Sequence, residues 1–240
     1  MTITNASASE KSQPITGPCP TNEVPSAEVQ TELDCLKTIF YCASHTILFI
    51  EDAVPTRVLY LLEGQVKLSM NASSGRRLIL GISQPGETLG LAASLCGKRF
   101  DTTAETLSRC KLASIDREAY LDFLAMYPSA YKNVVRELCL DRTRSHEQLR
   151  TMGLAAKAPE RLARLLLEWC DDGLKTDQGT RLSCSFTHGE IGEFIGTSRE
   201  TVTRIFREFK CRDLLQSRGS TLIISNVKAL EVYAGIEKFD

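Results

Sequence analysis

The chain has 240 residues, of which 42% are hydrophobic and 25% are charged, and its formal net charge at pH 7 is −1. This balance suits a soluble globular chain with two modest domains, each with a core of its own. No apolar run approaches the length of a membrane span, and the N-terminus lacks the features of a secretion signal, so we expect a cytoplasmic protein with no membrane partner.

The first segment, residues 1 to 28, is rich in Ser, Thr, Pro and Asn and poor in large apolar groups. It cannot bury enough surface to offset the entropy lost on ordering, so we expect a disordered tail. Nine cysteines are scattered along the chain without a CxxC pair, which indicates neither a metal site nor a disulfide framework. We expect most of these cysteines to be small core residues.

Residues 45 to 115 consist of short apolar stretches separated by glycines. Gly64, Gly75, Gly86 and Gly90 fall between these stretches, where glycine tolerates a positive φ or a close approach of the backbone. Many short strands joined by such turns predict a β sandwich or barrel.

A long helical pattern follows from residue 128 to about residue 153. Arg142 and Ser145 interrupt its apolar seam. Five residues keep the three- and four-residue spacing of a coiled coil: Tyr131, Val135, Leu138, Leu149 and Met152. Gly153 ends the pattern, and Pro159 suits the first turn of a new helix, so we expect a hinge at residues 153 to 158.

Two shorter helices are predicted near the C-terminus. Thr187 and Glu190 have the spacing of a capping box, which begins the first helix. Gly196 ends this helix with a residue that tolerates the left-handed conformation, and Ser198 is suited to cap the second helix. The second helix has apolar residues on one face: Val202, Ile205, Phe206 and Phe209.

The exposed face of the second helix has the chemistry of a DNA reader. Arg199 and Arg204 can each pair with O6 and N7 of guanine, and Glu200 can accept from N4 of cytosine. Two helices joined by a three-residue turn have the form of a helix-turn-helix, whose second helix enters the major groove. The alternative is an amphipathic helical hairpin whose charges are only solvated.

A hairpin is predicted at residues 217 to 225, with Arg218 at its tip, and would form a wing beside the two helices. Residues 199 to 218 carry more basic than acidic side chains, in a chain that is near neutral as a whole. We expect contacts with the DNA backbone from six polar or basic residues: Thr187, Ser198, Thr203, Arg207, Lys210 and Arg218.

Residues 187 to 225 resemble the DNA-binding domain of the CRP/FNR superfamily of bacterial transcription regulators, and the likeness extends upstream to about residue 40. LeuLeuGluGlyGlnValLysLeu and ProGlyGluThrLeuGly are similar to the β-roll signatures of cyclic-nucleotide-binding domains. The resemblance implies an α+β fold in three parts: an N-terminal β-roll of the double-stranded β-helix or jelly-roll type at residues 29 to 127, a dimerisation helix at 128 to 153, and a winged helix-turn-helix at 154 to 240.

The same resemblance implies a homodimeric transcription regulator that binds double-stranded DNA at an inverted repeat with TGTGA-like half-sites. RNA polymerase is the second partner that it implies. We expect no enzymatic activity, because the sequence has no nucleophile motif or acid–base cluster. A rival hypothesis is a ligand-binding regulator that acts through a protein partner.

An effector site is implied in the β-roll, at Gly86, Glu87, Thr88 and Leu89. Nucleotide-binding members of the superfamily hold the phosphate with an ArgSer pair about ten residues later. Phe100 and Asp101 stand at those two positions here, and Arg99 is one residue away, which on a strand means the opposite face. His146 and Glu147 replace a ThrSer pair of the long helix. Seven residues remain as effector candidates: Gly86, Glu87, Thr88, Leu89, Arg99, Asp101 and His146.

The identity of the effector stays open between cyclic AMP, haem, an iron–sulfur cluster and a thiol-redox response. Cys19, Cys35 and Cys42 depart from the spacing of cluster-binding members of the superfamily. A thiol switch would depend on exposure and on thiolate pKa. Haem would need an axial ligand, for which three residues are available: His45, Cys96 and Cys110.

Overall fold

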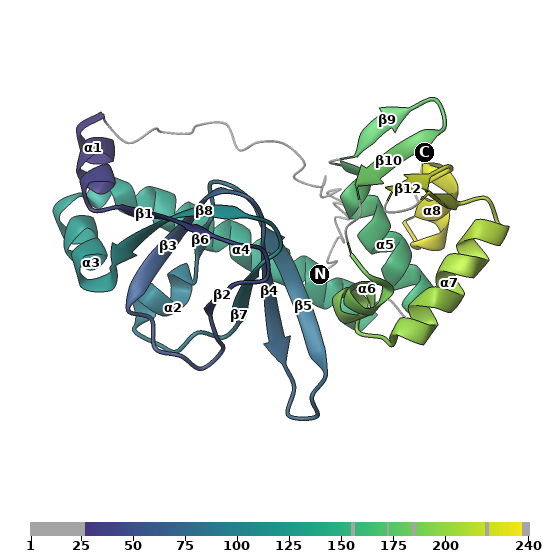
Figure 1. The fold of residues 1–240 in the computed structure, drawn as a ribbon, viewed down its shortest axis with the longest axis horizontal. Coiled ribbons are helices and arrows are strands. Elements are labelled where there is room, and N and C mark those ends of the chain that lie inside the picture. The colour runs from purple at the N-terminus through teal and green to yellow at the C-terminus, as the bar shows by residue number, and fades with distance from the viewer. Residues whose placement is uncertain (1–26, 155–156, 172, 184–185, 219–220, 237–240) are drawn as a thin grey trace, which may run out of the picture.

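The structure is a computed structural model that describes residues 27 to 154, 157 to 171, 173 to 183, 186 to 218 and 221 to 236. Two lobes are joined by one long helix (Figure 1). Residues 27 and 28, which we predicted to belong to the N-terminal tail, are the first residues of helix α1, and the rest of that tail lies outside the described residues. No described helix has the length and apolar character needed to cross a lipid bilayer.

The N-terminal lobe is an antiparallel β-roll flanked by short helices, as the sequence predicted. Its strands form two four-stranded sheets, β1-β8-β3-β6 and β2-β7-β4-β5, whose inner faces share one apolar core. The elements in chain order are α1 (Ala27–Cys35), β1 (Thr38–Cys42), β2 (Ile47–Phe49), β3 (Arg57–Glu63), β4 (Val66–Asn71), β5 (Arg77–Ser83), β6 (Thr88–Leu89), α2 (Leu91–Cys96), β7 (Thr103–Thr106), β8 (Cys110–Asp116) and α3 (Arg117–Met126).

All four predicted turn glycines of the roll adopt positive φ. Gly64, between β3 and β4, has a φ of 93°. A Cβ at this position would lie 2.6 Å from both the Arg109 carbonyl oxygen and Cys110 Sγ. The turn therefore needs glycine for its conformation and also for the close packing of the neighbouring strand.

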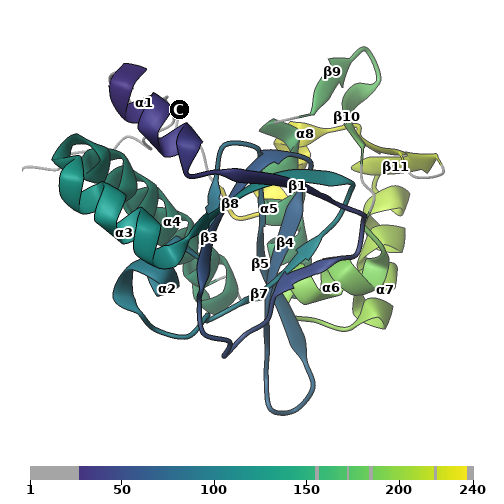
Figure 2. The same ribbon diagram turned by 60° about the vertical axis from the view of Figure 1, so that its left-hand side comes forward.

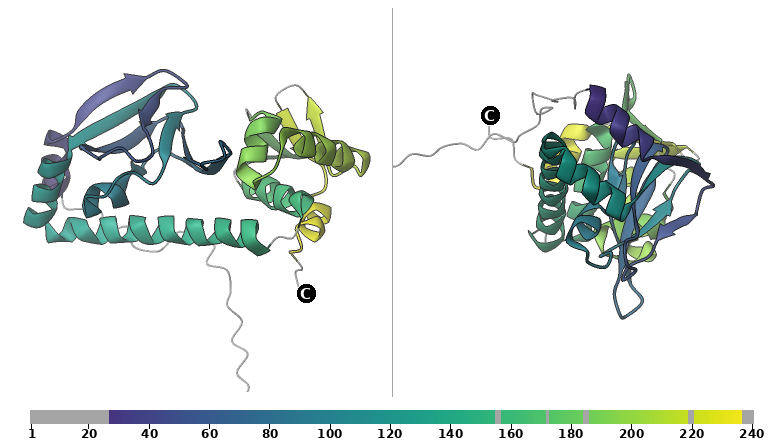
Figure 3. Two further views of the ribbon diagram at one scale, coloured as in Figure 1. Left: turned by 90° about the horizontal axis from the view of Figure 1, so that it is seen from below. Right: turned by 90° about the vertical axis from the view of Figure 1, so that its left-hand side faces the viewer.

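Helix α4 (Pro128–Leu154) runs along the β-roll and reaches the C-terminal lobe (Figure 3). It is continuous for 27 residues and ends one residue after Gly153, and Arg142 and Ser145, which interrupt its apolar seam, are exposed. A glycine inside a helix costs only about 1 kcal/mol relative to alanine, which the neighbouring turns can offset. The first half of α4 packs on the roll, where Ala130 and Val134 lie in one apolar cluster with residues of α3.

The C-terminal lobe packs four helices against a small antiparallel sheet of order β11-β12-β10-β9 (Figure 2). The hairpin of β9 and β10 was not predicted, whereas β11 and β12 form the predicted wing. The elements are α5 (Ala158–Asp171), β9 (Leu174–Thr176), β10 (Gly179–Ser183), α6 (His188–Ile195), α7 (Arg199–Cys211), β11 (Leu215–Arg218), β12 (Thr221–Ile224) and α8 (Val227–Tyr233).

The described cysteines are less buried than we expected. Cys110 and Cys170 are buried and Cys42 is half-buried. Four others are exposed: Cys35, Cys96, Cys139 and Cys211. The tendency of cysteine to be buried is an average over many proteins, so it does not predict the exposure of an individual cysteine.

Candidate nucleic-acid interface and effector site

Helix α6 begins at the predicted capping box. The Glu190 amide donates to Thr187 Oγ1 at 3.2 Å, and Glu190 Oε2 accepts from the Thr187 amide at 3.0 Å. Gly196 ends the helix with a φ of 63°, in the predicted left-handed conformation. The Thr187 hydroxyl is therefore hydrogen-bonded to Glu190, although Thr187 itself is exposed at the start of α6.

Helix α7 presents the predicted readers to solvent. The Thr201 amide donates to Ser198 Oγ at 3.2 Å, which confirms Ser198 as the N-cap. The apolar face is buried against the lobe, and the residues opposite to it are exposed: Arg199, Glu200, Thr203, Arg204 and Arg207. Among the described residues, the three arginines of this face form no ion pair, so their guanidinium groups are free for an anionic or base partner.

Glu200 lies at the very start of α7. Hydrogen bonds from its own backbone amide and from Ser198 lower the pKa of its carboxyl. The group is therefore an anion at neutral pH and an acceptor only. A group that can only accept hydrogen bonds can pair with a donor on a base edge, such as the N4 amino group of cytosine, but not with a base acceptor.

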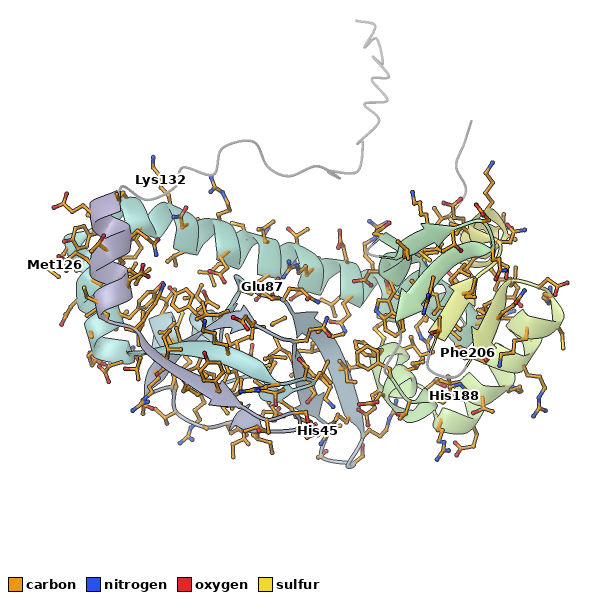
Figure 4. The ribbon with its side chains drawn as sticks, turned by 45° about the horizontal axis from the view of Figure 1, so that its top comes forward. His45, Glu87, Met126, Lys132, His188 and Phe206 are labelled. Carbon is orange, nitrogen blue, oxygen red and sulfur yellow. The ribbon has the colours of Figure 1, made fainter. Side chains whose placement is uncertain are left out.

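His188 was not among the predicted site residues, but it contacts helix α7 beside the candidate interface. Its Nδ1 lies 2.9 Å from Thr203 Oγ1, and its ring stacks on Phe206 with centroids 4.7 Å apart (Figure 4). Thr203 donates its single hydroxyl proton to the Arg199 carbonyl at 2.9 Å, so Nδ1 must be the donor to Thr203. The only signal in the sequence was the place of His188 directly after the N-cap of α6.

The wing is tied to the recognition helix. Lys210 Nζ donates to Ser217 Oγ at 2.6 Å, which joins the end of α7 to β11. Arg212 is paired with Glu208 at 3.2 Å, one turn back on the same helix. Arg218 is paired with Thr221 in the hairpin register, but its side chain and the tip of the wing lie outside the described residues.

Helix α4 contacts residues 86 to 89, the segment predicted to bind an effector. Glu137 of α4 accepts from the Thr88 amide at 2.6 Å and from the Thr88 hydroxyl at 2.9 Å. Arg144, two turns further along α4, pairs with Glu87 at 2.6 Å. Figure 4 shows Glu87 on the side of the roll that faces this helix. The two polar residues of the segment are therefore already satisfied by the chain itself.

An aromatic ring fills the roll beside this segment. Phe100 is 6% exposed and stacks on Phe49 with ring centroids 3.9 Å apart, and its ring would clash with any Cβ at Gly90. Leu89 is part of the same apolar core. A phosphate group would find no cation at Phe100, and burying an unpaired anion beside this ring would be costly.

Arg99 and Asp101 are both exposed, and they lie in a loop between α2 and β7. Neither residue lies in a strand, so the predicted placement of Arg99 on the opposite face of a strand is wrong. Arg99 Nη1 donates to the Asp52 carbonyl at 2.5 Å. Gly86 donates its amide to the Leu61 carbonyl at 2.8 Å, and His146 is exposed on α4.

The three residues considered as haem ligands have other surroundings. His45 Nδ1 lies 3.2 Å from Glu105 Oε1. Cys96 is exposed at the end of α2, and Cys110 is buried in the roll core. Among the described residues, the structure shows no contact between any two of these three.

Two domain families match this chain. Residues 40 to 127 match the cyclic nucleotide-binding domain family, and residues 160 to 233 match the Crp-like helix-turn-helix domain family. The chain belongs to the CRP/FNR superfamily of transcription regulators. Its β-roll, long helix and helix-turn-helix are the parts that this superfamily combines in a DNA-binding regulator.

Known relatives of this CRP/FNR regulator cover most of its length. It is 26% identical over 196 residues to a CRP-like cAMP-activated global transcriptional regulator of Mycobacterium tuberculosis. The matched region spans 81% of this chain and 87% of the relative. It is 29% identical over 173 residues to the transcriptional activatory protein AadR of Rhodopseudomonas palustris, which spans 70% and 69%.

A solved structure shares the fold. The c-di-GMP-responsive global regulator CLP of Xanthomonas campestris matches with a TM-score of 0.73 and 20% sequence identity, over 83% of this chain and 99% of that structure.

The predicted dimerisation residues of this CRP/FNR regulator divide into two groups. Tyr131, Val135 and Leu149 are exposed on α4, by 43%, 55% and 68%. Leu138 packs against the apolar cluster of α3 and α4, and Met152 lies next to Gly196 at the end of α6. The exposed group therefore leaves an apolar face on α4, and the other two residues join α4 to each lobe.

Proposed function

We propose that this regulator recognises an inverted repeat with TGTGA-like half-sites, with Arg199 and Arg204 on guanines and Glu200 on a cytosine. The observation that carries the proposal is the exposed face of α7. All three readers lie within its first two turns, and the two arginines have no ion-pair partner among the described residues. Bidentate arginine–guanine pairs supply the base preference.

Contacts with the DNA backbone are proposed from residues around these readers. Thr203 and Arg207 flank them on α7, and Lys210 lies further along the same helix. The backbone amides at the starts of α6 and α7, beside Thr187 and Ser198, suit phosphate because a helix N-terminus favours anions. Arg218 is proposed on the sequence alone.

We propose a homodimer formed through α4, because a two-fold DNA site calls for a two-fold protein. The exposed apolar residues of α4 support this assignment. In this scheme residues 29 to 127 form the sensor, residues 128 to 153 form the dimerisation helix and residues 154 to 240 bind DNA. RNA polymerase is the proposed partner at a promoter.

Cyclic AMP is not the effector in this proposal. Relatives differ in effector, since one is named as cAMP-activated and another as c-di-GMP responsive. Here Phe100 and Asp101 leave no cation for a cyclic phosphate, and Glu137 and Arg144 already satisfy Thr88 and Glu87. The residues beside the effector segment therefore support DNA binding that does not depend on a cyclic nucleotide.

The experiment is a binding titration with purified protein and three labelled duplexes: a TGTGA palindrome, a single half-site and a scrambled sequence. Each titration is run with and without cyclic AMP at fixed salt, because phosphate contacts make affinity salt-dependent. The proposal predicts preference for the palindrome and no change on adding cyclic AMP. Equal binding to all three duplexes would support the rival role through a protein partner.

A further inference from the structure

Lys67 of β4 is a buried lysine at the junction of the two lobes. Only 4% of its side chain is exposed, and its Nζ lies 3.3 Å from Glu105 Oε2 and 3.5 Å from Glu190 Oε1. Glu105 belongs to β7 of the same roll, whereas Glu190 belongs to α6 of the helix-turn-helix. A buried ammonium needs carboxylate partners. Lys67 therefore meets a charge from each lobe.

Apolar packing surrounds this ion pair. Ile79 of β5 is fully buried within the core of the C-terminal lobe, and Ile82 packs against the same core. β5 is an edge strand of its sheet and lies beside α6 (Figure 1). Gln148 of α4 adds a hydrogen bond of 2.9 Å to the Ile79 carbonyl. The helix-turn-helix thus covers an edge that would otherwise expose backbone groups.

The carboxylates around Lys67 differ in how well they are neutralised. Glu105 also lies 3.2 Å from His45 Nδ1 and 3.8 Å from Arg77 Nη1. Among the described residues, Lys67 is the one ion-pair partner of Glu190. Glu193, one turn after Glu190, has a buried Oε2 without a hydrogen bond. Removing the Lys67 charge would leave excess negative charge in this buried contact.

We propose that Lys67 is a positioning residue for DNA recognition: its ion pair with Glu190 fixes the orientation of the helix-turn-helix on the β-roll. This inference rests on the proposed function of the recognition helix. The contact is made through α6, so the readers on α7 stay exposed while the lobes are docked. When the helix-turn-helix of each subunit is docked on its β-roll, the two recognition helices of a dimer are held at one separation. Less orientational freedom is then lost on binding a palindrome, so binding is tighter.

Four variants separate the ion pair from other roles of these residues. Lys67→Met removes the charge and keeps most of the volume, and Lys67→Arg restores the charge. Glu190→Gln removes the ionic partner but keeps the capping box, because glutamine also serves at that position. Lys111→Met is the matched control, since Lys111 pairs with Glu63 at 3.4 Å on the roll surface, away from α6.

The first readout needs no DNA. Hydrogen exchange is measured in peptides covering β5 and α6, with α3 as the internal reference, because none of the four substitutions lies in α3. Lys67→Met and Glu190→Gln should each speed exchange in β5 and α6 by about tenfold, while Lys67→Arg and Lys111→Met stay near wild type. The double variant should change exchange by less than the sum of the single effects. Unchanged exchange in both single variants would overturn the proposal.

The second readout is affinity for the palindrome and for one half-site. Lys67→Met should weaken palindrome binding by about tenfold and leave half-site binding unchanged, because the reader face itself is intact. Unchanged or tighter palindrome binding, together with faster exchange, would also overturn the positioning role. Failure of the wild type to prefer the palindrome would instead reject the proposed function, while the exchange experiment would still test the contact.

Discussion

Glu137 and Thr88 join the long helix to the β-roll through two hydrogen bonds, of 2.6 Å from the Thr88 amide and 2.9 Å from its hydroxyl. Burial raises the pKa of the Glu137 carboxyl, and the two hydrogen bonds oppose that shift in part. Glu137 therefore engages both donors of Thr88, the backbone amide and the hydroxyl. These hydrogen bonds join the long helix directly to the β-roll.

Replacing Glu137 should destabilise the β-roll. Glu137→Ala leaves a backbone amide and a hydroxyl of Thr88 without their acceptor, which costs about 1–3 kcal/mol of unfolding free energy. Urea denaturation measures this loss. The control is Glu147→Ala, at an exposed position on the same helix. Equal effects of the two substitutions would show that the Thr88 contact contributes nothing of its own.

Arg199→Ala should relax preference at one base pair of each half-site. The loss should be about 1–3 kcal/mol for the preferred sequence and much smaller for a duplex changed at that pair. Competition binding with single-base variants of the palindrome measures it. Arg207→Ala, on the same exposed face, should weaken binding to all sequences alike. A uniform loss for Arg199→Ala would contradict its role as a base reader.

Val135→Glu should disrupt the dimer. A charge placed on the exposed apolar face of α4 would be buried without a partner when two helices pair. Sedimentation analysis should show a shift toward monomer at micromolar concentrations. Val232→Glu is the control, because Val232 is 78% exposed and lies on α8, away from this face. A dimer that survives Val135→Glu would place the subunit contact elsewhere.

His188 should make the C-terminal lobe sensitive to acid. Burial and the nearby Lys210 and Arg199 lower its pKa, so the unfolded chain binds the proton more tightly than the folded chain. Its contribution to stability is therefore complete above the ordinary histidine pKa of about 6.5 and is lost as the pH falls below that value.

The His188 prediction is checked by comparing the thermal unfolding of wild type and of His188→Gln at pH values above and below the ordinary histidine pKa of about 6.5. Glutamine can still donate to Thr203 but does not titrate near neutral pH. The variant should lose less stability than wild type on acidification. A parallel loss in both proteins would show that other groups cause the acid sensitivity.

Local signals in the sequence predicted the two helices of the helix-turn-helix well. Thr187 with Glu190, Gly196 and Ser198 fixed the ends of α6 and α7, because capping depends on residues within one turn of the helix end. The apolar spacing of α7 likewise predicted which side chains are exposed. The short strands and turn glycines predicted a β sandwich or barrel, and the resemblance to cyclic-nucleotide-binding domains narrowed this to a β-roll.

Other features depend on residues far apart in the sequence and could not be predicted from it. The ion pair of Lys67 with Glu190 joins two lobes, and no local pattern marks either residue as its partner. The β9 and β10 hairpin was missed because β9 is exposed throughout and has no alternation of apolar residues. The end of α4 at Leu154 lies within one residue of the end predicted at Gly153.

The most direct test of DNA recognition is selection of bound duplexes from a random-sequence library by the wild-type protein, without added nucleotide, followed by sequencing. We expect enrichment of an inverted repeat with TGTGA-like half-sites, and the same motif when cyclic AMP is present. Recovery of no motif, or of a motif only when cyclic AMP is added, would contradict it.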